Sequence, residues 1–220
     1  MPKAPAYEKI KQKLKDEIIS GALNSGDRLT IEDVAKRYNT SSMPAREALK
    51  SLQAEGLIEI TPRHGARINE LDAHKVRGIY DVIIAIEPMI TVQAAKMCSD
   101  EDVNKWFKLC KEYEALVNAG DFRNAYLINR YLHEIHFELA GNEKAREIYL
   151  QCYNSLEIAR NKFHAPTERQ IESAREHYLI AELIHAKAYD ALASVVSLHI
   201  SRTRDLIIGS IETFNKQAER

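Results

Sequence analysis

Hydrophobic residues recur at helical spacing around residues 40–57, and this stretch organises the N-terminal part of the chain. Four apolar residues fall on one face of a predicted helix, namely Ala45, Ala48, Leu49 and Leu52. Arg46 and Lys50 follow the same spacing on a neighbouring stripe, about 100° around the helix axis. A Ser-Ser pair that can cap and a proline suited to a first helical turn precede this pattern. The pattern predicts a short amphipathic helix with an apolar inner face and a basic outer face.

The neighbouring segments decide what this helix belongs to. Upstream, Thr30 and Asp33 have the spacing of a capping box, which predicts a helix to about Tyr38 followed by a turn. Downstream, residues 57–60 and 66–68 are β-prone and are separated by the turn sequence 61–65. With a further helix over residues 7–20, this order predicts a winged helix-turn-helix.

The remaining sequence shows helical periodicity and no strand pattern. Helix stops and capping patterns, including a predicted capping box after the stop at Ala165–Pro166, divide it into about six helices: 72–98, 100–117, 121–140, 143–164, 167–187 and 189–216. Pro88 lies inside the first of these. The fold class is therefore predicted to be mostly α, with a winged helix-turn-helix in residues 1–70 and an all-helical bundle in residues 71–220. Such bundles typically hold ligands between their helices.

Composition and charge narrow the function. The 220 residues are 45% hydrophobic with a formal net charge of −1, which suits two packed domains and excludes a protein that coats nucleic acid by bulk charge. Three cysteines without a CxxC pair indicate reduced thiols. The start lacks an apolar core like that of a signal peptide, and no apolar run approaches the roughly 18 residues that span a bilayer. We therefore expect a cytoplasmic protein with no membrane partner.

Several spaced motifs occur in order in the first seventy residues: Gly26-Asp-Arg-Leu29, the segment 31–38, Ser41-Ser-Met-Pro-Ala-Arg-Glu-Ala-Leu49 and Glu55-Gly-Leu57. Together they resemble the DNA-binding domain of the GntR family of bacterial transcription regulators. The chain departs from the family pattern at Ser42, where arginine is usual, and this loses one donor that could read a guanine edge or hold a phosphate.

The resemblance implies contacts to double-stranded DNA. At the start of the recognition helix, the residues expected to meet bases or phosphates are Ser41, Ser42, Met43 and Arg46. The residues expected to contact the DNA backbone and the groove edge are Arg28, Arg63, His64 and Gly65.

Histidines in the second half carry the other candidate chemistry. Taken alone, scattered histidines are more often structural than metal ligands. However, Asn129-x-x-x-His133 is followed by Asn142 in Ala-Gly-Asn, by Glu176-His177, and by Asp190-Ala with His199 nine residues further on. This pattern resembles the FCD effector domain of the FadR branch of the GntR family, in whose metal-binding members an Asp or Asn and three histidines ligate a divalent ion. The resemblance implies the ligand set Asn129, His133, His177 and His199.

This ligand set suits zinc first, with nickel, cobalt or manganese as alternatives, and leaves coordination positions that a small carboxylate could fill. Asn129 replaces the commoner Asp, so the site has one negative charge fewer. The family's usual arginine in the first bundle helix is also replaced, by Ile83. Arg130 or Arg160 could substitute as the effector-binding residue, although a surface or helix-pairing role is the commoner one for each.

Enzyme motifs are weak or missing in the sequence. His133-Glu-Ile-His136 has its histidines three apart, whereas the zinc protease motif needs them four apart. No phosphate-binding loop, GxGxxG or GxSxG pattern occurs. The sequence therefore favours a non-enzymatic regulator that senses a small carboxylate, with repression preferred to activation. A homodimer on palindromic half-sites is expected, because one helix and wing contact only a few base pairs. The alternative is a metal-dependent small-molecule enzyme whose winged helix is an interaction module.

Overall fold

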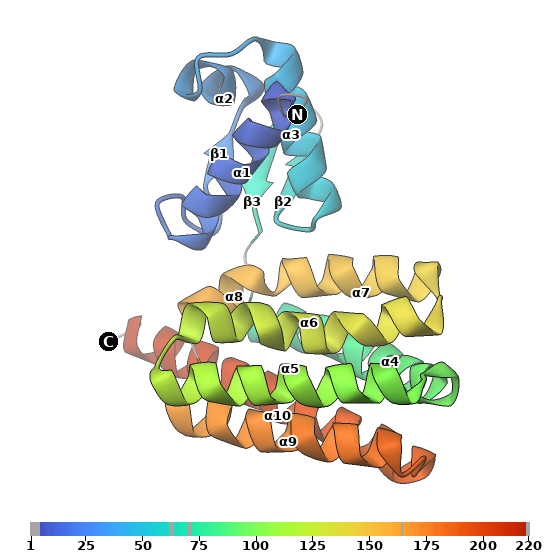
Figure 1. The fold of residues 1–220 in the computed structure, drawn as a ribbon. Coiled ribbons are helices and arrows are strands. Elements are labelled where there is room, and N and C mark those ends of the chain that lie inside the picture. Colours follow the sequence, from blue (N-terminus) through green and yellow to red (C-terminus); the bar gives the residue numbers. More distant parts are fainter. Residues whose placement is uncertain (1–4, 62–63, 70–71, 164, 219–220) are drawn as a thin grey trace. The chain divides into compact units, whose positions relative to one another are not determined.

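A computed structural model of the chain describes residues 5–61, 64–69, 72–163 and 165–218. By contacts, the chain divides into two compact units, Met1–Ile79 with Leu150–Phe163, and Tyr80–Tyr149 with His164–Arg220. The first contains a winged helix-turn-helix and the second is helical (Figure 1). The predicted mostly α fold class is confirmed.

The winged helix-turn-helix is built from three helices and a small sheet. The helices are α1 (Ala6–Ile19), α2 (Ile31–Arg37) and α3 (Ser42–Ala54), and the strands are β1 (Arg28–Leu29), β2 (Ile58–Thr61) and β3 (Gly65–Ile68). The sheet is antiparallel in the order β1-β3-β2, with Leu29 opposite Ala66 and Thr61 opposite Gly65. Strand β1 was not predicted, because two residues carry no pattern of their own and are ordered only by pairing with β3.

Of the helix caps predicted from the sequence in this unit, one forms as expected and one does not. The Thr30 hydroxyl accepts from the Asp33 N–H at 3.0 Å, and the Asp33 carboxylate accepts from the Thr30 N–H at 3.0 Å, so the predicted capping box is present. Ser41 occupies the N-cap of α3, but its side chain makes no capping hydrogen bond.

The core of this unit comes from the predicted inner faces. Ala45, Ala48, Leu49 and Leu52 of α3 are all buried, together with Leu14 and Ile18 of α1. Removing these apolar groups from water stabilises the packing of α1 on α3 by about 25 cal/mol per Å² of buried surface. The opposite face of α3 carries Arg46 and Lys50 and is exposed.

Gly65, at the start of β3, has a steric role that its sequence did not reveal. Its φ is +79°, and a Cβ atom placed there would lie 2.8 Å from the Leu29 carbonyl oxygen. Only glycine adopts this conformation without strain and allows so close an approach. Gly65 therefore permits the pairing of β1 with β3.

The helical segments beyond the winged helix-turn-helix are α4 (Ala73–Met97), α5 (Asp100–Ala119), α6 (Phe122–Ala140), α7 (Glu143–Ser155), α8 (Glu157–Lys162), α9 (Thr167–His185) and α10 (Tyr189–Ala218). Helix α5 packs against α6 and α9, and α9 packs against α10, as Figure 1 shows. Trp106, Tyr80 and Phe137 are among the large side chains that fill this core. Cys98, Cys110 and Cys152 are free in the structure.

Two helix boundaries differ from the sequence prediction. The single helix expected over 143–164 is interrupted at Leu156, whose N–H is shared by the carbonyls of Cys152 and Tyr153 at 3.2 Å each. The Ser155 hydroxyl also donates to the Gln151 carbonyl, a bond that bends helices. The capping box predicted to open α9 is absent, because Pro166 takes the N-cap and Gln170 donates to the Ala165 carbonyl instead.

Helix α4 is long and apolar enough to cross a membrane by length and composition, and 44% of its apolar window is buried within the structure. Core helices of soluble proteins meet the same criteria, so the length and composition of α4 are weak evidence for a membrane span. The buried carboxyl side chain of Glu87, midway along α4, takes part in the polar cluster described below.

Candidate metal centre and nucleic-acid interface

Three imidazole rings meet inside the helical unit. They belong to His133 of α6, His177 of α9 and His199 of α10, and each offers a ligand atom within 4.8 Å of the other two. His177 and His199 are each 3% exposed. Ring centroids lie 4.6 Å apart for His177 and His199, and 5.1 Å apart for His133 and either of the other two. The residues described by the structure thus bring together the three histidines that the family resemblance implied.

Asn129, the fourth residue of the implied ligand set, joins the same cluster. It lies one helical turn before His133 on α6, and its Oδ1 is 2.8 Å from the Nε2 atom of His177. Because an amide oxygen only accepts, the His177 Nε2 must donate in this arrangement.

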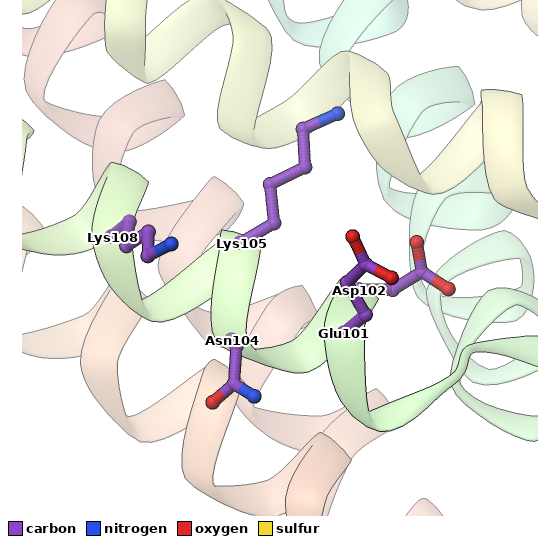
Figure 2. A pocket seen from close by; sticks show the side chains of 5 residues that line it. All are labelled: Glu101, Asp102, Asn104, Lys105 and Lys108. Atoms are coloured by element: carbon purple, nitrogen blue, oxygen red, sulfur yellow. The ribbon is translucent and has the colours of Figure 1, made fainter.

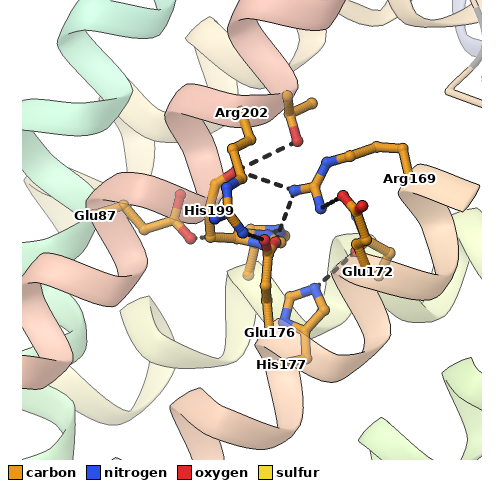
Figure 3. Close-up of polar contacts among 10 residues, drawn as sticks. Glu87, Arg169, Glu172, Glu176, His177, His199 and Arg202 are labelled. Carbon is orange, nitrogen blue, oxygen red and sulfur yellow. Dashed lines mark hydrogen bonds and ion pairs between the residues drawn. The ribbon is translucent and has the colours of Figure 1, made fainter.

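Two buried carboxylates fix the orientation of the other two rings. The His133 Nδ1 contacts the Glu87 carboxylate of α4, and the His199 Nδ1 lies 2.6 Å from the Glu176 Oε2 atom of α9 (Figure 3). Ionised carboxylates only accept, so each Nδ1 carries the proton. With the proton on Nδ1, a ring in its neutral form presents an unprotonated Nε2, and the Nε2 atoms of His133 and His199 face one another at 3.3 Å. Opposed lone pairs repel unless a proton or a metal cation lies between them.

The ionisation states support a cation rather than a shared proton. Burial lowers the pKa of His177 well below its ordinary value, and it also lowers the pKa of His199 despite the hydrogen bond that His199 donates to Glu176. Burial alone would raise the pKa of Glu176, but hydrogen bonds from His199, Arg169 and Arg202 bring it to about 2. Neutral imidazoles backed by ionised carboxylates are the usual surroundings of metal-ligating histidines. The donor set therefore fits a divalent metal ion.

The sequence did not indicate Glu87, Glu176 or Arg169. Glu176 accepts from Arg169 Nη2 at 2.7 Å and pairs with Arg202, in addition to His199. These carboxylates lie on α4 and α9, far from His133 and His199 in sequence, so only the packing of the helices reveals the pairs. Glu176 directly precedes His177, and this adjacency was the one available signal.

The two arginines predicted to hold an effector have other neighbours. Arg130 Nε donates to Glu134 Oε1 at 2.6 Å, one turn along α6. Arg160 lies over the Tyr153 ring, 3.9 Å from its centroid, in the first compact unit. The effector role of Arg130 and Arg160 stays a prediction.

The residues predicted to contact DNA are exposed where the structure describes them, except Gly65, which is half-buried. Ser41, Ser42, Met43 and Arg46 form an accessible group at the start of α3, with Met43 71% exposed. Arg28 is exposed on β1 and His64 is exposed beside β3. Arg63 lies outside the described residues.

A polar hollow at the start of α5 is a separate feature (Figure 2). It is lined by Glu101, Asp102, Asn104, Lys105 and Lys108. The Asp102 carboxylate is engaged in the capping box with Ser99, and Lys105 donates to the Tyr131 hydroxyl at 3.1 Å. These local bonds account for its central side chains, so it carries no functional assignment.

A winged helix-turn-helix with an exposed basic α3, followed by a helical domain with a buried polar cluster, defines a DNA-binding transcription regulator. Two family profiles match the chain: "Bacterial regulatory proteins, gntR family" over residues 6–68, and "FCD domain" over residues 78–202. The chain belongs to the GntR family and carries an FCD domain.

Individual relatives agree with this assignment. The chain is 25% identical over 198 residues to the HTH-type transcriptional regulator YdhC of Bacillus subtilis, covering 90% of this chain and 88% of YdhC. It is 20% identical to the HTH-type transcriptional repressor RspR of Escherichia coli, over 94% of this chain and 90% of RspR. The fold matches the solved structure of E. coli McbR/YncC with a TM-score of 0.77 at 16% identity. The match covers 94% of this chain and 99% of the McbR/YncC chain. YdhC and RspR are named as transcriptional regulators, so the enzyme alternative is set aside.

We expect Glu176→Gln to lower the free energy of unfolding by about 3 kcal/mol, because the buried Arg169 would lose its ionic partner. Trp106 is the only tryptophan and lies buried on α5, so its fluorescence during urea unfolding of chelator-treated protein reports on this helical unit.

The matched control is Glu172→Gln on the same helix, whose side chain is 58% exposed. A surface change of this kind should alter stability by less than about 0.5 kcal/mol. Equal effects of the two substitutions would contradict the structural role given to Glu176.

Proposed function

We propose that this chain is a cytoplasmic, metabolite-responsive repressor of the FadR branch, in which residues 1–70 bind DNA and residues 71–220 bind the effector and dimerise. The observation that carries the proposal is the convergence of three imidazoles in the helical unit of a chain that also carries a DNA-reading fold. The name of the relative RspR supports repression.

The proposed metal centre uses Asn129, His133, His177 and His199. Three imidazole nitrogens and one oxygen suit zinc before nickel, cobalt or manganese, and such a set leaves coordination positions for a ligand. A bound ion would act as a Lewis acid and anchor an anionic group. The hydrogen bond between His177 Nε2 and Asn129 Oδ1 joins two ligand atoms. The proton on His177 Nε2 must therefore move to Nδ1 or leave before that nitrogen can coordinate.

The effector is proposed to be a small carboxylate. Asn129 contributes no charge, so the cluster's fixed anions are Glu87 and Glu176, and both are already engaged by histidines. A divalent ion bound there would leave excess positive charge in a buried place, which an anionic ligand offsets.

Recognition of double-stranded DNA is assigned to the exposed start of α3 and to the wing. Ser41, whose side chain makes no capping bond, presents its hydroxyl with Ser42 and Met43 beside Arg46. The N-terminal part of a recognition helix meets base edges in the major groove, while Arg28, Arg63, His64 and Gly65 would follow the backbone and groove edge.

A homodimer on palindromic half-sites is proposed for two reasons. One helix and wing read too few base pairs for high affinity. In addition, α4 exposes Val82, Ala85 and Met89, spaced three and four residues apart, with Val82 40% and Met89 56% exposed. This spacing forms an apolar stripe of the kind that a symmetric copy covers. Effector binding would alter DNA affinity only if it favours one of two dimer states.

The metal centre is tested by elemental analysis of the purified protein after loading with zinc and removal of free ion. We expect about one zinc per chain in the wild type and a large loss in His133→Ala and His177→Ala, because three protein ligands are the usual minimum for such sites. His185→Ala, an exposed histidine on the same helix as His177, is the control and should retain the wild-type content. A wild-type content near zero, or full retention in both ligand variants, would exclude the centre.

The DNA interface is tested with an operator selected from random duplexes by the wild-type protein. We expect Arg46→Ala to weaken binding by about tenfold or more at 150 mM salt, since a good contact to a base contributes about 1–3 kcal/mol. Lys13→Ala, an exposed cation on α1, is the control and should bind nearly as the wild type does. Wild-type affinity for Arg46→Ala in a gel-shift titration would remove Arg46 from the interface.

A further inference from the structure

Arg169 of α9 is a buried cation whose hydrogen-bonding capacity is only partly used. The residue is 8% exposed. Its Nη2 atom donates to Glu176 Oε2 at 2.7 Å and to the His199 carbonyl at 3.3 Å. Its Nε and Nη1 atoms make no hydrogen bond to any residue that the structure describes. A buried guanidinium with two unsatisfied nitrogens costs free energy unless an acceptor is supplied.

No protein carboxylate in the described residues is placed to satisfy those nitrogens. The Nη1 atom forms an ion pair with Glu172 Oε2 at 3.7 Å, which is beyond hydrogen-bond distance, and the Glu172 side chain is 58% exposed. Glu176 already accepts from three side chains, as Figure 3 shows. The donors left over on Arg169 are therefore available to an external acceptor.

The unused Nε and Nη1 donors of Arg169 lie beside the histidine cluster, because the same guanidinium contacts one of the histidines and its carboxylate partner. Its Nη2 atom bonds the backbone of His199 and the carboxylate that orients the His199 ring. Tyr113 stacks edge-on against His177, with centroids 5.6 Å apart. Burial raises the pKa of Tyr113, while the Ser173 hydroxyl and the Arg169 charge oppose that rise.

The chemistry of the acceptor follows from these groups. Guanidinium is planar and always charged, and its preferred acceptor is a carboxylate or a phosphate. A carboxylate is the acidic group of the proposed effector, and one of its oxygens can accept from an unused nitrogen of Arg169 while the same molecule fills an open metal position. We propose that Arg169 binds the carboxylate group of the effector beside the histidine cluster. This assignment rests on the proposed function and replaces the arginine that is missing at Ile83 with a residue from α9.

The experiment uses the full-length zinc-loaded protein, with acetate, succinate and citrate as probes and acetamide as the neutral comparison. Arginine Nε–H resonances are recorded by NMR, and the Arg169 signal is identified by its loss in Arg169→Lys. We expect the Arg169 signal to shift with at least one carboxylate and to stay in place with acetamide.

Calorimetric titration of the same carboxylate gives the second measurement. Arg169→Lys keeps the positive charge but loses the planar donor set, so we expect the Kd to rise at least about tenfold. Its zinc content should remain that of the wild type. Arg175→Lys, an exposed arginine on the same helix, is the matched control and should bind the carboxylate as the wild type does.

The outcomes separate this inference from the proposed function. An Arg169 signal unmoved by all three carboxylates, or an unchanged Kd in Arg169→Lys, overturns the role of Arg169 even when the zinc content is normal. A wild-type protein without zinc overturns the metal centre, and the NMR titration of the zinc-free protein then decides Arg169 alone. If Arg169→Lys does not fold, the wild-type signal still decides the question, with its assignment taken from Arg169→Gln.

Discussion

Two hydrogen bonds between carboxylates and imidazoles determine how two of the histidine rings are oriented inside the helical domain. Glu87 orients His133 and Glu176 orients His199, and because ionised carboxylates only accept, both rings keep their protons on Nδ1. The two Nε2 atoms must then point inward at one another. This constraint links α4, α6, α9 and α10 around a single point and makes that point suitable for a cation.

The same constraint explains why the cluster remains charged in a buried place. The carboxylate of Glu176 is stabilised by Arg169, Arg202 and His199 together, so its negative charge is retained despite burial. That arrangement uses only part of Arg169, and Asn129 supplies an oxygen without a charge. The balance of charge in the cluster thus favours an anion as the second component after a metal ion.

Much of the fold could be predicted because its signals are local. The capping box at Thr30 and Asp33 and the apolar spacing around Leu49 depend only on near neighbours in the sequence, and both appear as expected. Strand β1 and the break at Leu156 depend on pairing with β3 and on side-chain bonds within α7. No sequence periodicity records those effects.

The cluster was predictable to a smaller extent. Asn129 and His133 lie one helical turn apart, which the sequence shows directly, whereas His177 and His199 could be added only through family resemblance. The sequence did not predict roles for Glu87, Glu176 and Arg169, because a charged residue on a helix usually faces solvent. Their burial is a result of how the helices pack.

Anomalous diffraction from crystals of the zinc-loaded protein, recorded on both sides of the zinc absorption edge, locates any bound ion. If the three imidazoles bind zinc, one strong peak lies about 2.0–2.1 Å from the Nε2 atoms of His133, His177 and His199. A peak at any other place, or none among the three rings, would contradict the proposed metal centre.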